Sequence, residues 1–97
     1  MKQSVYRNKQ VFGKRFKKQI AWNCYAYLAV HIANELKAFK KYNINSYPHG
    51  FNSIEEWHEV VDKMIYSFEQ IEKDSSDRVK IEEGLQLFAK YFEDLWD

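Results

Sequence analysis

Two histidines each precede a carboxylate by four residues, a spacing that places both side chains on one face of a helix. The pairs are His31 with Glu35 and His58 with Asp62. Such a pair is a starting point for a zinc site or for a general base. A zinc site needs at least three protein ligands, and the chain has a single cysteine and no HExxH motif. We therefore expect each histidine to hydrogen-bond its neighbouring carboxylate, and we predict no metal site.

Other arrangements that carry chemistry in enzymes do not stand out either. The three glycines lie far apart, at positions 13, 50 and 84, so they form no glycine-rich loop that could cradle a phosphate. No Ser-His-Asp pattern and no pair of catalytic carboxylates can be assigned. Cys24 lies within an apolar stripe, where a free cysteine behaves as a small core residue. We predict a protein without enzymatic activity and without a cofactor.

The formal net charge of +1 conceals a division of charge between the two halves of the chain. Residues 1–50 carry ten Lys or Arg and one acid, which gives +9, whereas residues 51–97 carry five Lys or Arg and thirteen acids, which gives −8. Such asymmetry has two explanations, namely an anionic partner or pairing between the two halves of one fold.

The first explanation points to the basic residues at the start of the chain. Four of them lie in the first turns of a predicted helix, where the helix terminus already carries partial positive charge, so a phosphate-bearing partner would relieve the repulsion. Trp22, Tyr25 and Tyr27 follow, and such rings stack on bases. The sequence thus allows a protein that binds nucleic acid or a nucleotide. The candidate partner-binding or anion-binding residues are Arg7, Lys9, Lys14, Arg15, Lys17 and Lys18.

The second explanation is geometric. In an antiparallel bundle, the start of the first helix lies beside the end of the second helix and the start of the third. The acids expected there are Glu69, Glu72, Asp74, Asp77, Glu82 and Glu83. At the opposite end, Lys37, Lys40 and Lys41 would meet Glu55, Glu56 and Glu59, and also Glu93, Asp94 and Asp97. Each exposed pair contributes only about 0–1 kcal/mol, but together the pairs favour this topology.

The hydrophobic pattern predicts an all-α fold, a three-helix antiparallel bundle that follows a basic N-terminal arm at residues 1–13. The helical domain is expected to span residues 14–97. Its helices are expected at about 14–42, 54–73 and 78–96. Residues 47–50 fit a type I turn, and Ser53 with Glu56 forms a capping box that opens the second helix.

The first predicted helix is apolar on two sides. One stripe recurs every four residues and is expected to face the core: Phe16, Ile20, Cys24, Leu28, Ile32 and Leu36. A second apolar set consists of Trp22, Tyr25, Ala26, Ala29 and Ala33. Seventeen aromatic residues, 18% of the chain, are too many for a small core to cover. Because monomers rarely expose large apolar patches and two-fold dimers are common, we predict that the second set is a homodimer interface. The competing explanation is that the basic arm folds back over this face, with Val5, Tyr6 and Phe12 as its cover.

The third predicted helix contains two residues with specific structural expectations. Gly84 interrupts it at a cost of about 1 kcal/mol relative to alanine, so we expect it to permit a close approach between helices. Phe88 lies at the middle of its apolar stripe and is predicted to be a core residue.

Two stretches of the sequence carry a family resemblance. They are EWHEVVDKMIYSFEQI at residues 56–71 and GLQLFAKYFEDLWD at residues 84–97. The combination resembles a family of small tailed-phage and prophage proteins that end in a GLxLFAKYFxDLWD-type helix. The resemblance covers roughly residues 20–97 and excludes the basic arm. It implies a phage origin and implies no particular chemistry.

Together these observations favour a binding protein. We expect a small phage-derived protein that engages a host or phage macromolecule, most simply a protein, with inhibition of a host defence system as one such role. The alternatives are the nucleic-acid or nucleotide binder and a structural homo-oligomer. The longest apolar stretch, residues 20–33, contains Asn23 and His31 and is too short and too polar to span a membrane. With a single cysteine, the chain is expected in a reducing cytoplasm. The resemblance to phage proteins implies that this is the cytoplasm of an infected bacterial cell.

Overall fold

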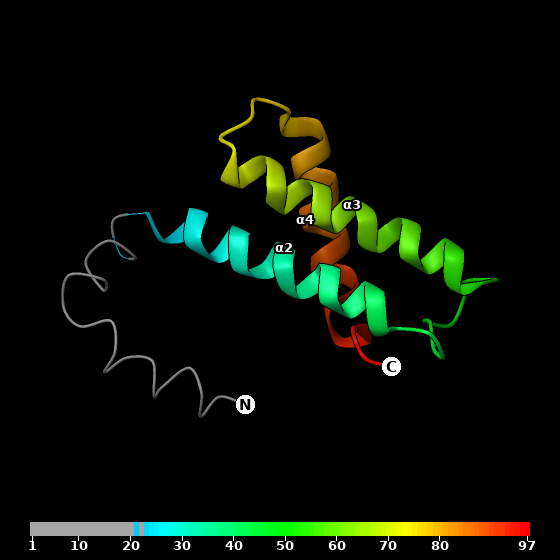
Figure 1. The fold of residues 1–97 in the computed structure, drawn as a ribbon. Helices are drawn as coiled ribbons and strands as arrows, with labels where there is room; N and C mark the ends of the chain where they lie inside the picture. The colour runs from blue at the N-terminus through cyan, green and yellow to red at the C-terminus, as the bar shows by residue number, and fades with distance from the viewer. Residues whose placement is uncertain (1–20, 22) are drawn as a thin grey trace, which may run out of the picture.

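The computed structural model describes residues 21 and 23–97, and these residues form an all-α fold (Figure 1). Its helices are α2 (Cys24–Tyr42), α3 (Ile54–Glu72) and α4 (Arg78–Tyr91), followed by a short 3-10 helix, η1 (Phe92–Asp94). The predicted three-helix all-α architecture is confirmed. The predicted basic arm and the predicted beginning of the first helix lie outside the described residues.

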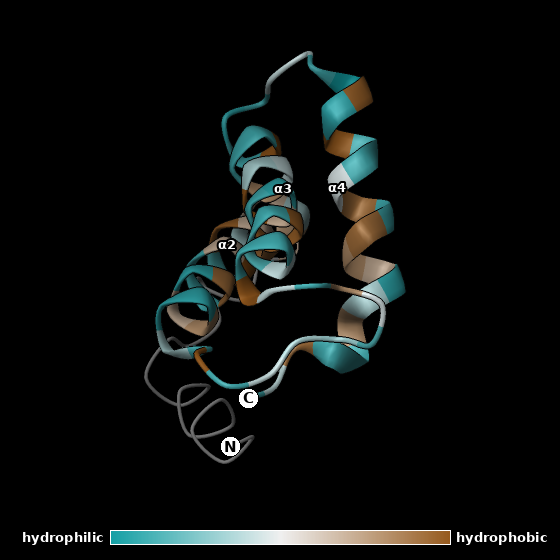
Figure 2. Cartoon of the chain, turned by 90° about the vertical axis from the view of Figure 1, so that its right-hand side faces the viewer, coloured by the Kyte–Doolittle hydropathy of each residue, from teal (hydrophilic) through white to brown (hydrophobic). Residues whose placement is uncertain are grey.

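Helix α3 is the centre of the structure. Helices α2 and α3 run antiparallel and side by side, and α4 crosses behind them (Figure 1). Both α2 and α4 pack on α3, whereas no Cα atom of α2 lies within 8 Å of a Cα atom of α4. Figure 2 shows the same arrangement from the side, with α2 and α3 together and α4 standing across from them. The two outer helices are therefore held together through α3 and not by close backbone contact with each other.

Helix α3 begins where the sequence places its cap. The Ser53 hydroxyl accepts a hydrogen bond from the Glu56 backbone N–H at 3.2 Å. The Glu56 carboxylate reaches back to the backbone N–H of Asn52 at 2.9 Å, one residue earlier than a standard capping box. The loop before this cap turns at Pro48–Phe51, where the Phe51 N–H bonds the Pro48 carbonyl and Gly50 has φ +105°. The predicted turn at residues 47–50 was therefore wrong by one residue.

The core is built on the apolar side of α3. Trp57 is completely buried and meets the rings of Phe39, Phe51 and Tyr91 edge-on, with centroid distances from 5.5 to 6.4 Å. Helix α4 adds one fully buried side chain, Ile81. The buried hydrophobic residues are Ala29, Ala33, Leu36, Trp57, Val61, Met64, Ile65, Phe68 and Ile81. Each outer helix thus reaches the interior through its contact with α3.

The predicted core stripe of the first helix was wrong in part. Ala29 and Ala33 are buried against α3, whereas Leu28 is 52% exposed and Cys24 is exposed. A four-residue repeat advances about 40° per step around a helix of 3.6 residues per turn, so six such positions cannot share one face. Ala29, Ala33 and Leu36 follow the four-then-three spacing that does keep to one face.

Gly84 marks the point where α4 crosses α3. A Cβ atom at this position would lie 2.5 Å from the Lys63 carbonyl oxygen and would also overlap the Ser67 side chain. Beside it, the buried Ser67 hydroxyl donates a hydrogen bond of 2.5 Å to the Ile81 carbonyl. The close approach predicted for Gly84 is therefore present in the structure.

Helix α4 ends earlier than residue 96, the predicted end of the third helix. It gives way to η1 after Tyr91, and the Leu95 N–H bonds the Phe92 carbonyl. Phe88 is only half-buried, between Phe68 and Phe92 at centroid distances of 5.0 and 5.3 Å. Its predicted place in the core is corrected to the edge of the core, because α4 crosses α3 and leaves one side of Phe88 uncovered.

The basic first half and the acidic second half do meet across α2 and α3. Lys37 pairs with Glu69 at 2.5 Å and Lys40 pairs with Asp62 at 2.7 Å. The predicted partners Glu55, Glu56 and Glu59 were wrong, because the antiparallel register brings later turns of α3 beside these lysines. Both pairs are partly exposed, so each contributes little to stability.

Candidate functional site

The structure places only some of the residues predicted to form sites. The basic set Arg7, Lys9, Lys14, Arg15, Lys17 and Lys18 lies outside the described residues, as does Trp22. Of the predicted dimer interface, Tyr25 is exposed and Ala26 is half-buried. Ala29 and Ala33 are 2% and 4% exposed, because they allow α2 to pack closely on α3. This corrects the predicted interface, while the homodimer itself stays a prediction.

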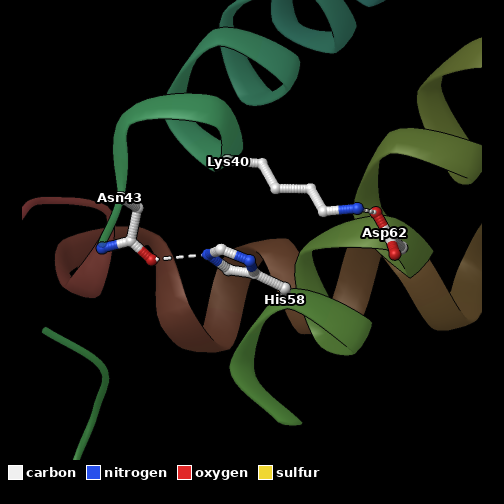
Figure 3. Close-up of polar contacts among 4 residues, drawn as sticks. All are labelled: Lys40, Asn43, His58 and Asp62. Carbon is white, nitrogen blue, oxygen red and sulfur yellow. Dashed lines mark hydrogen bonds and ion pairs between the residues drawn. The ribbon is translucent and has the colours of Figure 1, made fainter. Parts of the chain in front are cut away.

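The two histidine–carboxylate pairs do not form a common site. His31 and Glu35 lie on the surface, 3.8 Å apart and each 70% exposed. His58 does not pair with Asp62. Instead, His58 hydrogen-bonds Asn43 just after the end of α2, and Asp62 forms an ion pair with Lys40 (Figure 3). Among the described residues, no group of three or more His, Cys, Asp or Glu side chains could hold a metal ion.

His58 belongs to a polar cluster that closes one end of the molecule. The buried Asn43 amide donates to the Ser46 carbonyl at 2.9 Å and to Asp97 Oδ1 at 3.0 Å. Both amide hydrogens are therefore used, which leaves Asn43 Oδ1 to accept from His58 Nε2–H at 2.9 Å. Asp97 also accepts from the backbone N–H groups of Asn45 and Ser46. The cluster ties the α2–α3 loop to the segment after η1, which is a structural role.

The pKa of Asp97 makes this cluster sensitive to pH. The hydrogen bond from the Asn45 backbone N–H, supported by that from Ser46, holds the pKa of the Asp97 carboxyl below its ordinary value of 3.8. A depressed folded-state pKa stabilises the fold above the unfolded-state value, and this stabilisation disappears as the pH falls through the folded-state pKa. We expect Asp97→Asn to lower the melting temperature at pH 7 and to have a progressively smaller effect as the pH falls below 3.8 and through the folded-state pKa.

A thermal melt followed by circular dichroism at several pH values measures this effect. Glu93→Gln is the matched control, since Glu93 is an exposed acid in η1, four residues before Asp97, and makes no hydrogen bond or ion pair within the described part of the chain. An Asp97→Asn melting difference that does not change with pH would contradict the role given to the carboxylate.

The main concave feature is an apolar groove between α2 and α4, which we call the α2–α4 groove. Its first section has a volume of about 380 Å³ and lies at the start of α2, with Phe68 and Ile71 of α3 as its floor. Its charged side chains, Asp74 and Arg78, come from the α3–α4 connection and from the start of α4. Its lining residues are Tyr25, Leu28, Ala29, Ile32, Phe68, Ile71, Asp74, Ser75, Arg78, Ile81 and Leu85.

The second section continues the groove toward the end of α2. It has a volume of about 520 Å³, and Ile32 lines both sections, so the two adjoin at this side chain. Glu35 is its one ionisable carboxylate. Phe92 projects at its edge and is 59% exposed. The lining residues are Ile32, Glu35, Leu36, Ala38, Phe39, Tyr42, Phe88, Phe92 and Leu95.

The groove arises because α4 crosses α3 at an angle and its backbone stays away from the backbone of α2. Large side chains that a closed bundle would bury are therefore left half-covered along both outer helices. Sequence reasoning placed Leu28, Ile32 and Phe88 in a core and so missed this site. The available signal was the surplus of apolar residues on the first predicted helix, which indicated a contact surface but not its location.

Comparisons of the chain with protein-family models, with curated proteins and with solved structures found no match. Within the described part of the chain, no helix combines the length and the apolar character needed to cross a membrane. The α2–α4 groove is thus the feature from which a function can be argued.

Proposed function

We propose that this chain is a non-enzymatic binding protein of phage origin whose α2–α4 groove takes an amphipathic helix of a host or phage protein. One observation carries the proposal: two adjoining apolar sections share Ile32 and run along both outer helices, with Leu28 and Phe92 of their lining more than half exposed. Contiguous apolar surface of this kind marks contact sites. A groove between two helices suits the apolar side of a third.

The lining indicates the chemistry of the partner helix. Side chains of the partner helix at positions i, i+3 or i+4 and i+7 would lie along the groove. The groove offers them the aromatic rings of Phe88 and Phe92, and aromatic residues supply much of the binding energy at protein interfaces. The charged residues of the lining are two acids, Asp74 and Glu35, and one base, Arg78. The Arg78 guanidinium also pairs with the Glu82 carboxylate at 3.9 Å. This acidic surplus favours lysine or arginine beside the apolar stripe of the partner.

The resemblance to phage proteins supports a host or phage protein as the partner, with inhibition of a defence system as a consequence that we expect of the complex. The nucleic-acid alternative depends on basic residues that the structure does not describe, so it stays a prediction from the sequence.

Selection of helical peptides against the full chain tests the groove. We expect enriched peptides to share an apolar stripe flanked by basic residues. Phe92→Glu places a charge at the groove edge and should weaken their binding by about 30-fold, the effect of losing about 2 kcal/mol at an interface anchor. The substitution removes a mostly exposed ring, so the fold should survive, which circular dichroism would verify.

Val79→Glu is the control for this experiment. Val79 lies in the first turn of α4, the helix that precedes η1, is 81% exposed and lines neither section of the groove. Equal loss of binding in both variants, or selected peptides that bind Phe92→Glu unchanged, would contradict the groove as the binding site.

A further inference from the structure

We infer that residues 1–20 of this chain are the resident occupant of the α2–α4 groove and that a partner helix must displace them. This inference rests on the groove being a docking site, as proposed above, and adds a regulatory contact within the same chain.

The first support is where this segment joins the groove. Helix α2 begins at Cys24, and its first turns supply Tyr25 and Leu28 to the first section. The chain therefore enters α2 at the mouth of the groove. From Tyr25 to Tyr42 the helix is about 26 Å long at 1.5 Å per residue. Twenty residues reach about 30 Å as a helix and about 66 Å when extended, so they can return along the whole groove in either form.

The second support is the composition of the segment. Its apolar side chains recur along its length and match the apolar lining: Val5, Tyr6, Val11, Phe12, Phe16 and Ile20. It also carries seven Lys or Arg and no acid. A basic, aromatic segment of this kind has the chemistry derived above for the partner helix.

The third support is charge complementarity at the mouth. Asp74 lines the first section, and Glu72 lies beside it at the end of α3. Within the described part of the chain, neither carboxylate forms an ion pair. The lysines and arginine of residues 14–18 precede the first described residues of α2 by only a few positions in the sequence, so their charge is available to complement these carboxylates if the segment enters the groove.

A spin label on the segment tests the inference in the full chain. Cys24→Ser removes the single cysteine, which is exposed, and Gln10→Cys then carries a nitroxide. If the segment occupies the groove, the methyl signals of Leu28, Ile32 and Leu85 should lose intensity and recover when the nitroxide is reduced. The exposed Val79 methyls, outside the groove, should keep their intensity. Phe12→Glu with Phe16→Glu should restore the groove signals.

A mixed sample separates the same chain from a second copy. Spin-labelled chains without isotope are added to isotope-labelled chains without the nitroxide. Intensity loss in this mixture would place the segment of one copy in the groove of another and would overturn the inference. No loss in either sample would overturn it as well. If neither sample shows intensity loss but selected peptides bind the unchanged chain and not Phe92→Glu, the groove is still a docking site. The assignment of residues 1–20 as its occupant is then wrong.

Discussion

Trp57→Ala is expected to destabilise the protein by about 3–5 kcal/mol, the range found for buried large aromatic residues. Trp57 is completely buried, and three rings from α2, the α2–α3 loop and α4 pack against it. Its removal would leave a cavity where side chains of α2 and α4 meet on α3. For a domain with a total stability of about 5–15 kcal/mol, this loss approaches unfolding.

Urea denaturation followed by circular dichroism measures this loss. Trp57→Phe is the matched control, because the indole Nε1–H is buried and has no hydrogen-bond partner within the described part of the chain. Phenylalanine therefore removes volume without breaking a hydrogen bond, and it should cost much less than alanine. A change below about 1 kcal/mol for Trp57→Ala would contradict the central position given to this side chain.

Gly84→Ala should also destabilise the fold, against the usual preference of helices for alanine. Propensity alone predicts a gain of about 1 kcal/mol. The added Cβ atom would lie 2.5 Å from the Lys63 carbonyl oxygen, which is backbone and cannot swing away. Overpacking typically costs about 1–3 kcal/mol, and separating the helices would also weaken the bond from Ser67 to the Ile81 carbonyl.

Ala89→Gly gives the matched comparison in the same helix. Ala89 is exposed, so only propensity acts there and glycine should cost about 1 kcal/mol. Alanine should thus be preferred at position 89 and glycine at position 84, as measured by denaturant midpoints. Stabilisation by Gly84→Ala would contradict the close crossing of α3 and α4.

Helix α3 was the element best predicted from sequence. Its cap and its three-and-four apolar spacing are local signals, and the structure begins the helix at Ile54 with Ser53 as its N-cap. The faces of the first helix were harder to predict, because small alanines carry a weak hydrophobic signal yet allow the closest packing. Ala29 and Ala33 were therefore assigned to a dimer interface, although they lie against α3.

The groove and the polar cluster could not be predicted in the same way. The groove depends on the angle at which α4 crosses α3, and Gly84 indicated a close contact without giving that angle. The hydrogen bond between Asn43 and Asp97 joins residues 54 positions apart. No periodicity within a single helix encodes such a pairing, since it follows from how the helices and loops are placed together.

Site-specific photo-crosslinking from position 92 tests most directly whether the α2–α4 groove takes a helix of another protein. A photoreactive residue replaces Phe92 in one full chain and Val79 in another, and the crosslinked peptides are identified by mass spectrometry. We predict that position 92 reacts with one recurrent segment of a partner protein, with apolar residues at helical spacing and flanking basic residues. This adduct should be lost in Leu28→Glu and absent from position 79. Equal adducts from both positions, or adducts from position 92 only with other copies of this chain, would contradict the proposed function.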